Sequence, residues 1–254
     1  MTVAGRAIGV SIWLVVAACS SASTAPTASA PAPAPVPPWP RIAVLGASMS
    51  AGFGGTPLAE AFAAAAPGAT IDDEASVFVF QDAPARGREQ VDAALVTPPQ
   101  LVVAIDFLFW HAYNGDGPER LTRVEQGLAD LARLRDAGAL VVVGDIPRIT
   151  TSPLLIPASA VPSVDDLATI NARIHAWGDA PGTLVVPFAS WAEPLAAGGD
   201  VEISPTERVP AASLVTEDGL HPNALGVWNV LHRVDAEMER RLGTPAAALV
   251  FARP

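Results

Sequence analysis

The chain has 254 residues, half of them apolar, which allows one globular domain of ordinary size with a sizeable core. Its formal net charge of −11 disfavours nucleic acid as a partner, because phosphate contacts need clustered Lys and Arg. The single cysteine, Cys19, excludes a disulfide framework and a cysteine-based metal site. We expect no cofactor, since no His, Asp and Glu cluster has metal-ligand spacing and the glycine-rich run 46–55 lacks the P-loop lysine.

The first eighteen residues are typical of a signal peptide. Arg6 gives a positive start, Ile8 to Val16 form a short apolar core, and the run Val-Ala-Ala-Cys ending at Cys19 resembles a bacterial lipobox. This pattern predicts cleavage before Cys19 and acylation of its thiol. The alternative is a signal peptide cut elsewhere, with Cys19 incidental. The apolar run is too short for a transmembrane helix, which needs about 20 apolar residues.

Residues 20–40 are mostly Ala, Pro, Ser and Thr and carry no charge. Such a composition predicts an extended, disordered tether. We therefore divide the chain into a signal peptide (1–18), a lipidated cysteine with its tether (19–40) and a globular domain (41–254). This organisation predicts a membrane-anchored lipoprotein of the cell envelope that faces the periplasm or the exterior.

Short apolar runs within the domain alternate with helical patterns. The runs 42–45, 101–105, 140–143 and 184–186 predict buried strands, and 69–71 predicts a shorter one. Helices are predicted over 57–66, 86–95, 118–137, 163–177 and 224–242. Continuously apolar strands between helices favour a parallel sheet covered on both faces, which is a three-layer α/β/α sandwich. Ligands of such sheets bind beyond the carboxyl ends of the strands, where Ser48, Asp106 and Asp145 fall.

Ser48 follows the first strand among small residues, where backbone N–H groups can converge on a ligand oxygen. The run Asp218-Gly-Leu-His221-Pro-Asn223 holds a carboxylate and an imidazole three residues apart. Asp218 would fix the histidine tautomer, and His221 would take the serine proton. The alternative is a surface turn with a helix cap, because Asp, Gly, Pro and Asn are all turn residues.

On these residues the chain resembles the SGNH/GDSL hydrolases over residues 41–242. Gly46-Ala-Ser48 is similar to the family's Gly-Asp-Ser block, and Asp218 to Asn223 to its Asp-x-x-His-Pro block. Residues 121–147 and 170–173 are similar to its middle section and to the helix before its last strand. The resemblance implies a flavodoxin-like fold and a serine esterase or acyl hydrolase, with Ser48 as nucleophile, His221 as base and Asp218 orienting it. The implied substrate is a small-molecule or glycan ester, such as an O-acyl group of a glycan.

The oxyanion hole departs from the family pattern. The family takes donors from the serine amide, here Ser48, from a glycine amide after the second strand and from an asparagine side chain. The glycine's place falls near Ser76, whose amide could donate, and the asparagine block reads Ala-Ile-Asp106-Phe. A protonated Asp106, or Asn114 further along, would supply the side-chain donor. The alternative function is a catalytically impaired binding or scaffold lipoprotein on the same fold.

Aromatic residues follow the 101–105 strand. Phe107, Trp110 and His111 are predicted to line the substrate pocket, with Phe109 and Tyr113 beside them. The alternative is that two or three of the aromatic residues, and His111, belong to the core.

Overall fold

The computed structural model describes residues 38–243 and 249–254. The predicted signal peptide, Cys19 and all but the last residues of the predicted tether lie outside the described residues. Among the helices of these described ranges, none combines the length and the apolar character that crossing a membrane requires.

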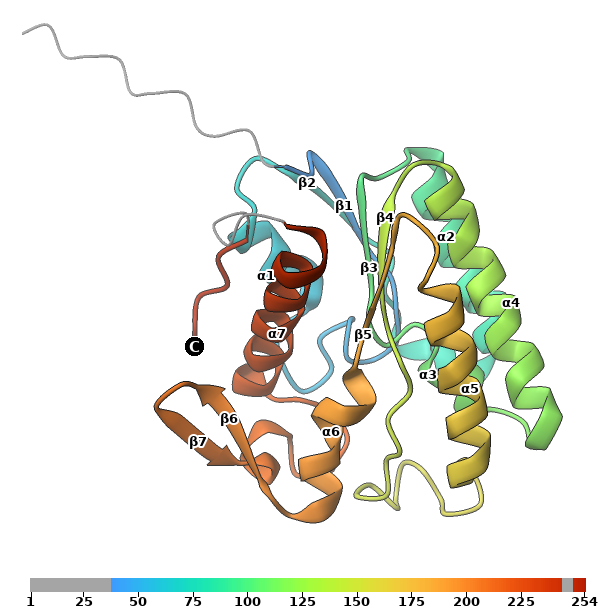
Figure 1. Ribbon diagram of the computed structural model, residues 1–254, viewed down its shortest axis with the longest axis vertical. Helices are drawn as coiled ribbons and strands as arrows, with labels where there is room; N and C mark the ends of the chain where they lie inside the picture. The colour runs from blue at the N-terminus through green and yellow to red at the C-terminus, as the bar shows by residue number, and fades with distance from the viewer. Residues whose placement is uncertain (1–37, 244–248) are drawn as a thin grey trace, which may run out of the picture. The chain divides into compact units, whose positions relative to one another are not determined.

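A five-stranded parallel sheet in the order β2-β1-β3-β4-β5 forms the centre of the domain (Figure 1). Its strands are β1 (Arg41–Val44), β2 (Thr70–Asp73), β3 (Leu101–Ala104), β4 (Leu140–Gly144) and β5 (Thr183–Val186). This order is that of flavodoxin-like folds, in which the chain reverses direction across the sheet after the second strand. The predicted strands are present, with bounds shifted by one or two residues.

Helices cover both faces of the sheet, which confirms the predicted three-layer architecture (Figure 1). One face carries α1 (Leu58–Ala65) and α7 (Ala224–Leu242), and the other carries α2 (Ala83–Val96), α4 (Gly117–Asp136) and α5 (Val164–Trp177). Successive residues of β1 enter different cores: Ala43 packs in the cluster with α4, and Ile42 and Val44 pack in the cluster with α7. Strands buried on both sides have to be apolar at every position, which explains their uninterrupted runs.

Several short elements lie outside the predicted pattern. The 3-10 helix η1 (Val77–Gln81) and the helix α3 (Phe109–Tyr113) occupy loops at the carboxyl ends of β2 and β3. A larger departure from the predicted pattern follows β5. The chain there forms α6 (Phe188–Ala197), then an antiparallel hairpin of β6 (Asp200–Ser204) and β7 (Glu207–Pro210), and then η2 (Ala211–Leu214). We call residues 187–214 the cap segment.

The cap segment has a small core of its own, built on Val201, Ile203, Ala211 and Leu214. Leu225 and Trp228 of α7 pack against this core, so the segment is fixed to the main domain. Figure 1 shows it at the end of the sheet where β5 runs into α6. The cap segment therefore stands at the edge where ligands of parallel sheets bind.

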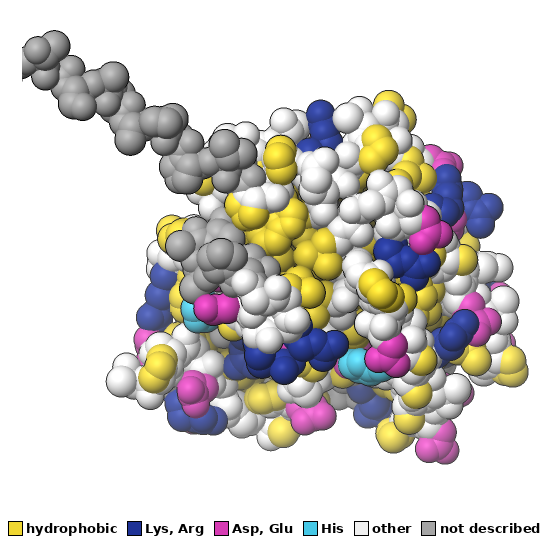
Figure 2. All heavy atoms as spheres, turned by 45° about the horizontal axis from the view of Figure 1, so that its top comes forward, with side chains coloured by type: hydrophobic (Ala, Val, Ile, Leu, Met, Phe, Trp, Pro, Cys, Tyr) yellow, Lys and Arg dark blue, Asp and Glu magenta, His cyan; other side chains and the backbone are white. Residues whose placement is uncertain are grey.

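Basic and acidic side chains are interspersed on the face shown in Figure 2. Ion pairs of the described residues include Arg86–Glu89 at 2.8 Å and Arg253–Glu207 at 2.7 Å, and both are largely exposed. Exposed pairs of this kind contribute about 0–1 kcal/mol each. The apolar clusters on the two faces of the sheet therefore dominate the stability of the domain.

Candidate active site

Ser48 lies in a tight turn at the carboxyl end of β1. The turn starts at Gly46, whose φ of +143° is rarely adopted by residues with a side chain. A Cβ at Gly46 would lie 2.1 Å from Oδ1 of Asp106, so only glycine fits there. The chain then turns back on itself, and the Phe53 N–H donates to the Ser48 carbonyl at 2.9 Å. This geometry holds Ser48 partly exposed at the rim of the sheet.

The loop that carries Asp218 and His221 is closed by its own backbone. Val215 and Pro222 form an isolated antiparallel bridge, and the Thr216 N–H donates to the His221 carbonyl at 2.8 Å. Asn223 then begins α7, because its side chain accepts from the Gly226 N–H at 3.1 Å. The interpretation of this run as a turn with a helix cap is thus correct for its backbone, and the side chains of Asp218 and His221 can still contact each other.

The structure brings Ser48, His221 and Asp218 together. Ser48 Oγ lies 2.8 Å from Nε2 of His221, and Nδ1 of the same ring lies 2.7 Å from Oδ2 of Asp218. The other Asp218 oxygen accepts from the backbone N–H groups of Leu220 at 2.8 Å and His221 at 2.9 Å. Burial raises the pKa of Asp218, but hydrogen bonds from His221 and Leu220 outweigh it and hold the pKa below its usual range. An ionised Asp218 keeps the Nδ1 proton in place and leaves Nε2 free to accept the serine proton.

Asp106 corrects one prediction. Its carboxylate lies beside a cavity next to Ser48, but it accepts four hydrogen bonds from residues 47–50, which we call the nucleophile turn after the predicted role of Ser48. The donors are the N–H groups of Ala47 and Met49, both at 3.0 Å, and the N–H and hydroxyl of Ser50 at 3.3 and 2.5 Å. Burial raises the pKa of Asp106, and these hydrogen bonds oppose the rise. Because both oxygens are occupied as acceptors, Asp106 is placed to hold the turn rather than to donate to an oxyanion.

The other two predicted oxyanion donors are also occupied. The Ser76 N–H donates to the Gly46 carbonyl at 3.0 Å, and the Ser76 hydroxyl caps η1 by accepting from Phe78 N–H at 3.2 Å. The Asn114 amide donates to the Phe80 carbonyl at 2.9 Å. Within the described part of the chain, the N–H of Ser48 itself makes no hydrogen bond, unlike its neighbours that bind Asp106. The Ser48 amide is therefore the predicted donor that the structure leaves available.

The three residues predicted to line the pocket lie elsewhere. Phe107 is fully buried in the core, and Trp110 packs against Ala47 and tilts toward Phe80. His111 is fully buried, and its Nδ1 contacts the Phe107 carbonyl at 3.1 Å. The alternative that these residues belong to the core is thus correct for Phe107 and His111, because the buried side of α3 faces the helices that cover the sheet.

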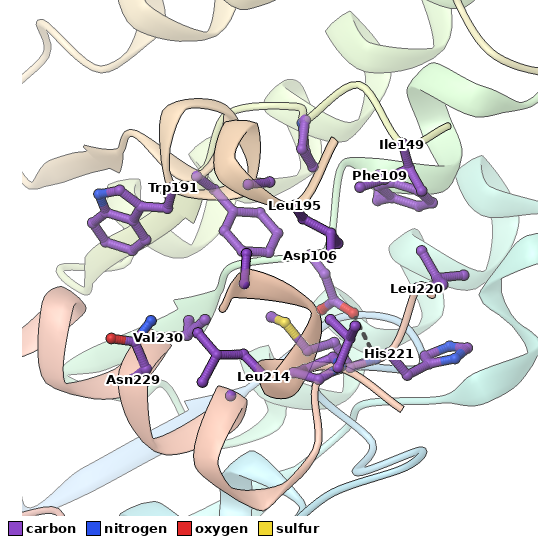
Figure 3. A pocket seen from close by; sticks show the side chains of 18 of the residues that line it. Asp106, Phe109, Ile149, Trp191, Leu195, Leu214, Leu220, His221, Asn229 and Val230 are labelled. Carbon is purple, nitrogen blue, oxygen red and sulfur yellow. Dashed lines mark hydrogen bonds between the residues drawn. The ribbon is translucent and has the colours of Figure 1, made fainter. Parts of the chain in front are cut away.

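A cavity of about 110 Å³ opens beside Ser48 and His221 (Figure 3). Its lining is mostly apolar and comes from the cap segment, from α7 and from loops after β3 and β4. Phe109, which follows the strand as predicted, is part of this lining. The sequence offered no signal for the cap-segment residues, since they come near Ser48 and His221 only through tertiary packing.

Asp145, also predicted at the rim, supports this cavity indirectly. Its buried carboxylate accepts from the Ala189 N–H at 2.6 Å in the first turn of α6, and His175 Nε2 lies 3.0 Å from its other oxygen. Asp145 therefore fixes the start of the helix that forms one cavity wall. His175 and His232 are exposed residues and do not reach the site. No group of three His, Cys, Asp or Glu suited to a metal ion occurs among the residues that the structure describes.

Solved structures with a similar fold include the crystal structure of TesA, at a TM-score of 0.52 and 21% identity, covering 79% of this chain and 98% of that one. A lipase/acylhydrolase from Enterococcus faecalis matches at a TM-score of 0.51 and 14% identity, with coverages of 84% and 99%. A catalytic mutant of an acetylxylan esterase from Geobacillus stearothermophilus matches at 0.50 and 12%, with coverages of 78% and 93%. The chain has the SGNH/GDSL hydrolase fold.

No protein-family model and no curated protein matches the sequence. At these low identities the likeness concerns the fold, so the chemistry of this SGNH-fold protein has to be argued from its own site. Ser48, His221 and Asp218 stand at the edge of the sheet where this fold binds ligands.

Proposed function

We propose that the protein is a serine esterase that hydrolyses carboxylic esters through Ser48, His221 and Asp218. The observation that carries the proposal is the unbroken hydrogen-bond chain from Ser48 Oγ through the His221 ring to the Asp218 carboxylate. Such an arrangement converts a weakly nucleophilic hydroxyl into an activated one. The fold that the chain shares with known acylhydrolases supports the same conclusion.

In this mechanism Ser48 Oγ attacks the ester carbonyl while its proton passes to Nε2 of His221. The Ser48 N–H stabilises the negative charge that develops on the carbonyl oxygen. His221 then returns the proton to the leaving alcohol, and an acyl group remains bound to Ser48. A water molecule, deprotonated by His221, attacks this acyl-enzyme, and His221 gives the proton to Ser48 Oγ as the carboxylic acid is released. Asp218 keeps the ring oriented in both halves of the cycle.

The proposal is tested with purified residues 38–254, p-nitrophenyl esters and a fluorophosphonate probe. We expect hydrolysis, and labelling of Ser48 by the probe. Ser48→Ala should abolish both, whereas Ser190→Ala, an exposed serine of α6, should abolish neither. Labelling of a different serine, such as Ser50, would identify another nucleophile and overturn the assignment.

We further propose that the protein is a lipoprotein anchored through Cys19, on the strength of the lipobox-like sequence. An O-acyl group of a glycan is a fitting substrate, because an acetylxylan esterase shares the fold and an envelope location would bring such esters within reach.

A binding or scaffold protein is the second candidate function. It is favoured by the occupied Ser76, Asp106 and Asn114 groups, which leave fewer oxyanion donors than the sequence predicted. Absence of both ester hydrolysis and probe labelling would support it.

A further inference from the structure

The helix α6 has an apolar stripe that nothing in the domain fully covers. Phe188, Trp191, Ala192 and Leu195 recur at the spacing of one helical face, which normally packs into a core. None of the residues of α6 is fully buried. All four of these side chains line the cavity beside Ser48, although Phe188 and Trp191 also pack against the cluster with α7 and Leu195 against the core of the cap segment.

The facing walls of the cavity are apolar as well. Figure 3 shows Trp191 and Leu195 on one side of the space and Leu214 and Val230 on the other, with His221 at one end. Among the described lining residues the charged group is Asp106, whose oxygens are already bound by the nucleophile turn. A polar or charged ligand would lose its hydration in this space and gain few hydrogen bonds.

From these contacts, and resting on the proposed esterase function, we infer that the cavity binds the acyl chain of the substrate and selects a medium-length alkyl chain over acetyl. The scissile carbonyl lies at Ser48, and the chain extends between α6 and α7. An apolar cavity of about 150 Å³ accommodates a molecule with the six carbons of benzene. The present cavity of about 110 Å³ thus suits an alkyl chain of about four to six carbons, as in a hexanoyl ester.

An acetyl group would leave most of this apolar surface uncovered. Each methylene that enters the cavity should raise kcat/KM by about 4-fold, the equivalent of about 0.8 kcal/mol per buried methylene. Hexanoyl has four more methylenes than acetyl, so kcat/KM for p-nitrophenyl hexanoate should exceed kcat/KM for p-nitrophenyl acetate by about 100-fold. This factor is smaller than full additivity would give, because the cavity is partly open.

The matched test uses one substitution at two places on α6. Ala192→Phe places a ring in the cavity, whereas Ala196→Phe adds the same ring at an exposed position of the same helix. We expect Ala192→Phe to lower the ratio of kcat/KM for the hexanoyl ester to kcat/KM for the acetyl ester by about 10-fold or more, and Ala196→Phe to leave this ratio unchanged. Leu195→Ala, which enlarges the cavity, should shift the optimum toward longer chains and serves if Ala192→Phe does not fold.

A binding experiment tests this inference independently of the proposed function. Saturation-transfer NMR on the Ser48→Ala protein, with hexanamide and acetamide as probes, needs no turnover. Saturation transfer to the hexanamide methyl group would support the cavity as an alkyl site if Ala192→Phe abolishes the signal and Ala196→Phe does not. If that signal is present while the native protein hydrolyses no ester, the esterase proposal fails and the alkyl site stands. An active enzyme that prefers acetyl esters, with no hexanamide signal, would overturn the inference.

Discussion

The carboxylate of Asp106 accepts a 2.5 Å hydrogen bond from the hydroxyl of Ser50, two residues beyond the proposed nucleophile. Three backbone N–H groups of the same turn donate to the two oxygens of this carboxylate. A side chain at the end of β3 thus sets the conformation of a turn at the end of β1.

Asp106→Asn should destabilise the domain and slow catalysis. The amide nitrogen that replaces one oxygen cannot accept, so at least one buried N–H of the turn loses its partner, at a cost of about 2 kcal/mol. Urea unfolding would measure this loss, with Asp116→Asn at an exposed aspartate as the control. An Asp106→Asn protein more active than the native enzyme would show that a donor is needed at this position.

Asp218→Asn should lower kcat by a factor on the order of 10³–10⁴, because a neutral amide can hold His221 in the wrong tautomer. The overall fold should persist, since the amide side chain retains one oxygen that can accept from the backbone N–H groups of Leu220 and His221. Steady-state kinetics with Glu217→Gln, the exposed neighbouring acid, supplies the control. Equal activity of the two variants would exclude Asp218 from the proposed mechanism.

Gly46→Ala should destabilise the domain by about 3 kcal/mol or more, since its Cβ would overlap Asp106 at 2.1 Å. Gly198→Ala is the matched change, because that glycine also has a positive φ of 65° but its Cβ would meet nothing within 4 Å. It should cost only about 1 kcal/mol of backbone strain. Thermal unfolding of both variants gives the comparison, and similar losses would mean that the contact with Asp106 is unimportant.

The stability of the domain should fall as the pH drops from about 6.5 toward 4. Burial lowers the pKa of His111 to about 4, so between these values the unfolded chain binds a proton that the folded protein does not. The difference between the two pKa values corresponds to about 3 kcal/mol of stability, which is lost in full only once the pH is below the folded pKa of about 4. Urea unfolding at several pH values should show a shallower dependence for His111→Phe than for the native protein. An equally steep dependence for His111→Phe would show that His111 does not cause the loss of stability.

Cys19→Ala should move the protein from the membrane fraction to the soluble or secreted one, if the lipobox is used. Fractionation followed by immunoblotting would detect the change, and Ser20→Ala is the neighbouring control. An unchanged distribution would remove the lipid anchor from the proposal.

The sheet could be predicted because each of its central strands is buried on both sides and therefore apolar without interruption. The bounds of α7 could also be predicted, because they depend on local features. The helix starts after Asn223, whose side chain caps it, and an amphipathic pattern continues to Leu242. The hairpin of the cap segment could not be predicted in this way. Val201 and Ile203 alternate with polar residues over only a few positions, and their partners Leu195 and Trp228 lie elsewhere in the chain.

The residues of the candidate site also differ in whether local sequence could predict them. Asp218 and His221 were predictable because they share one short loop, and Ser48 because it ends a strand. The predicted role of the Ser76 N–H was wrong, and the role of Asn114 stays a prediction, because sequence shows which groups can donate and not where they point. Both groups donate to carbonyls of neighbouring loops, of Gly46 and Phe80 respectively.

The cap segment enters the fold after β5 and leaves it just before the loop of Asp218 and His221. Ser48 belongs to a different part of the chain, held by β1 and Asp106. Side chains of residues 187–214 could therefore be varied separately from Ser48, which would alter the proposed acyl preference while the proposed nucleophile keeps its position. If the proposed esterase activity is found, directed libraries confined to this stretch offer a route to new ester selectivities.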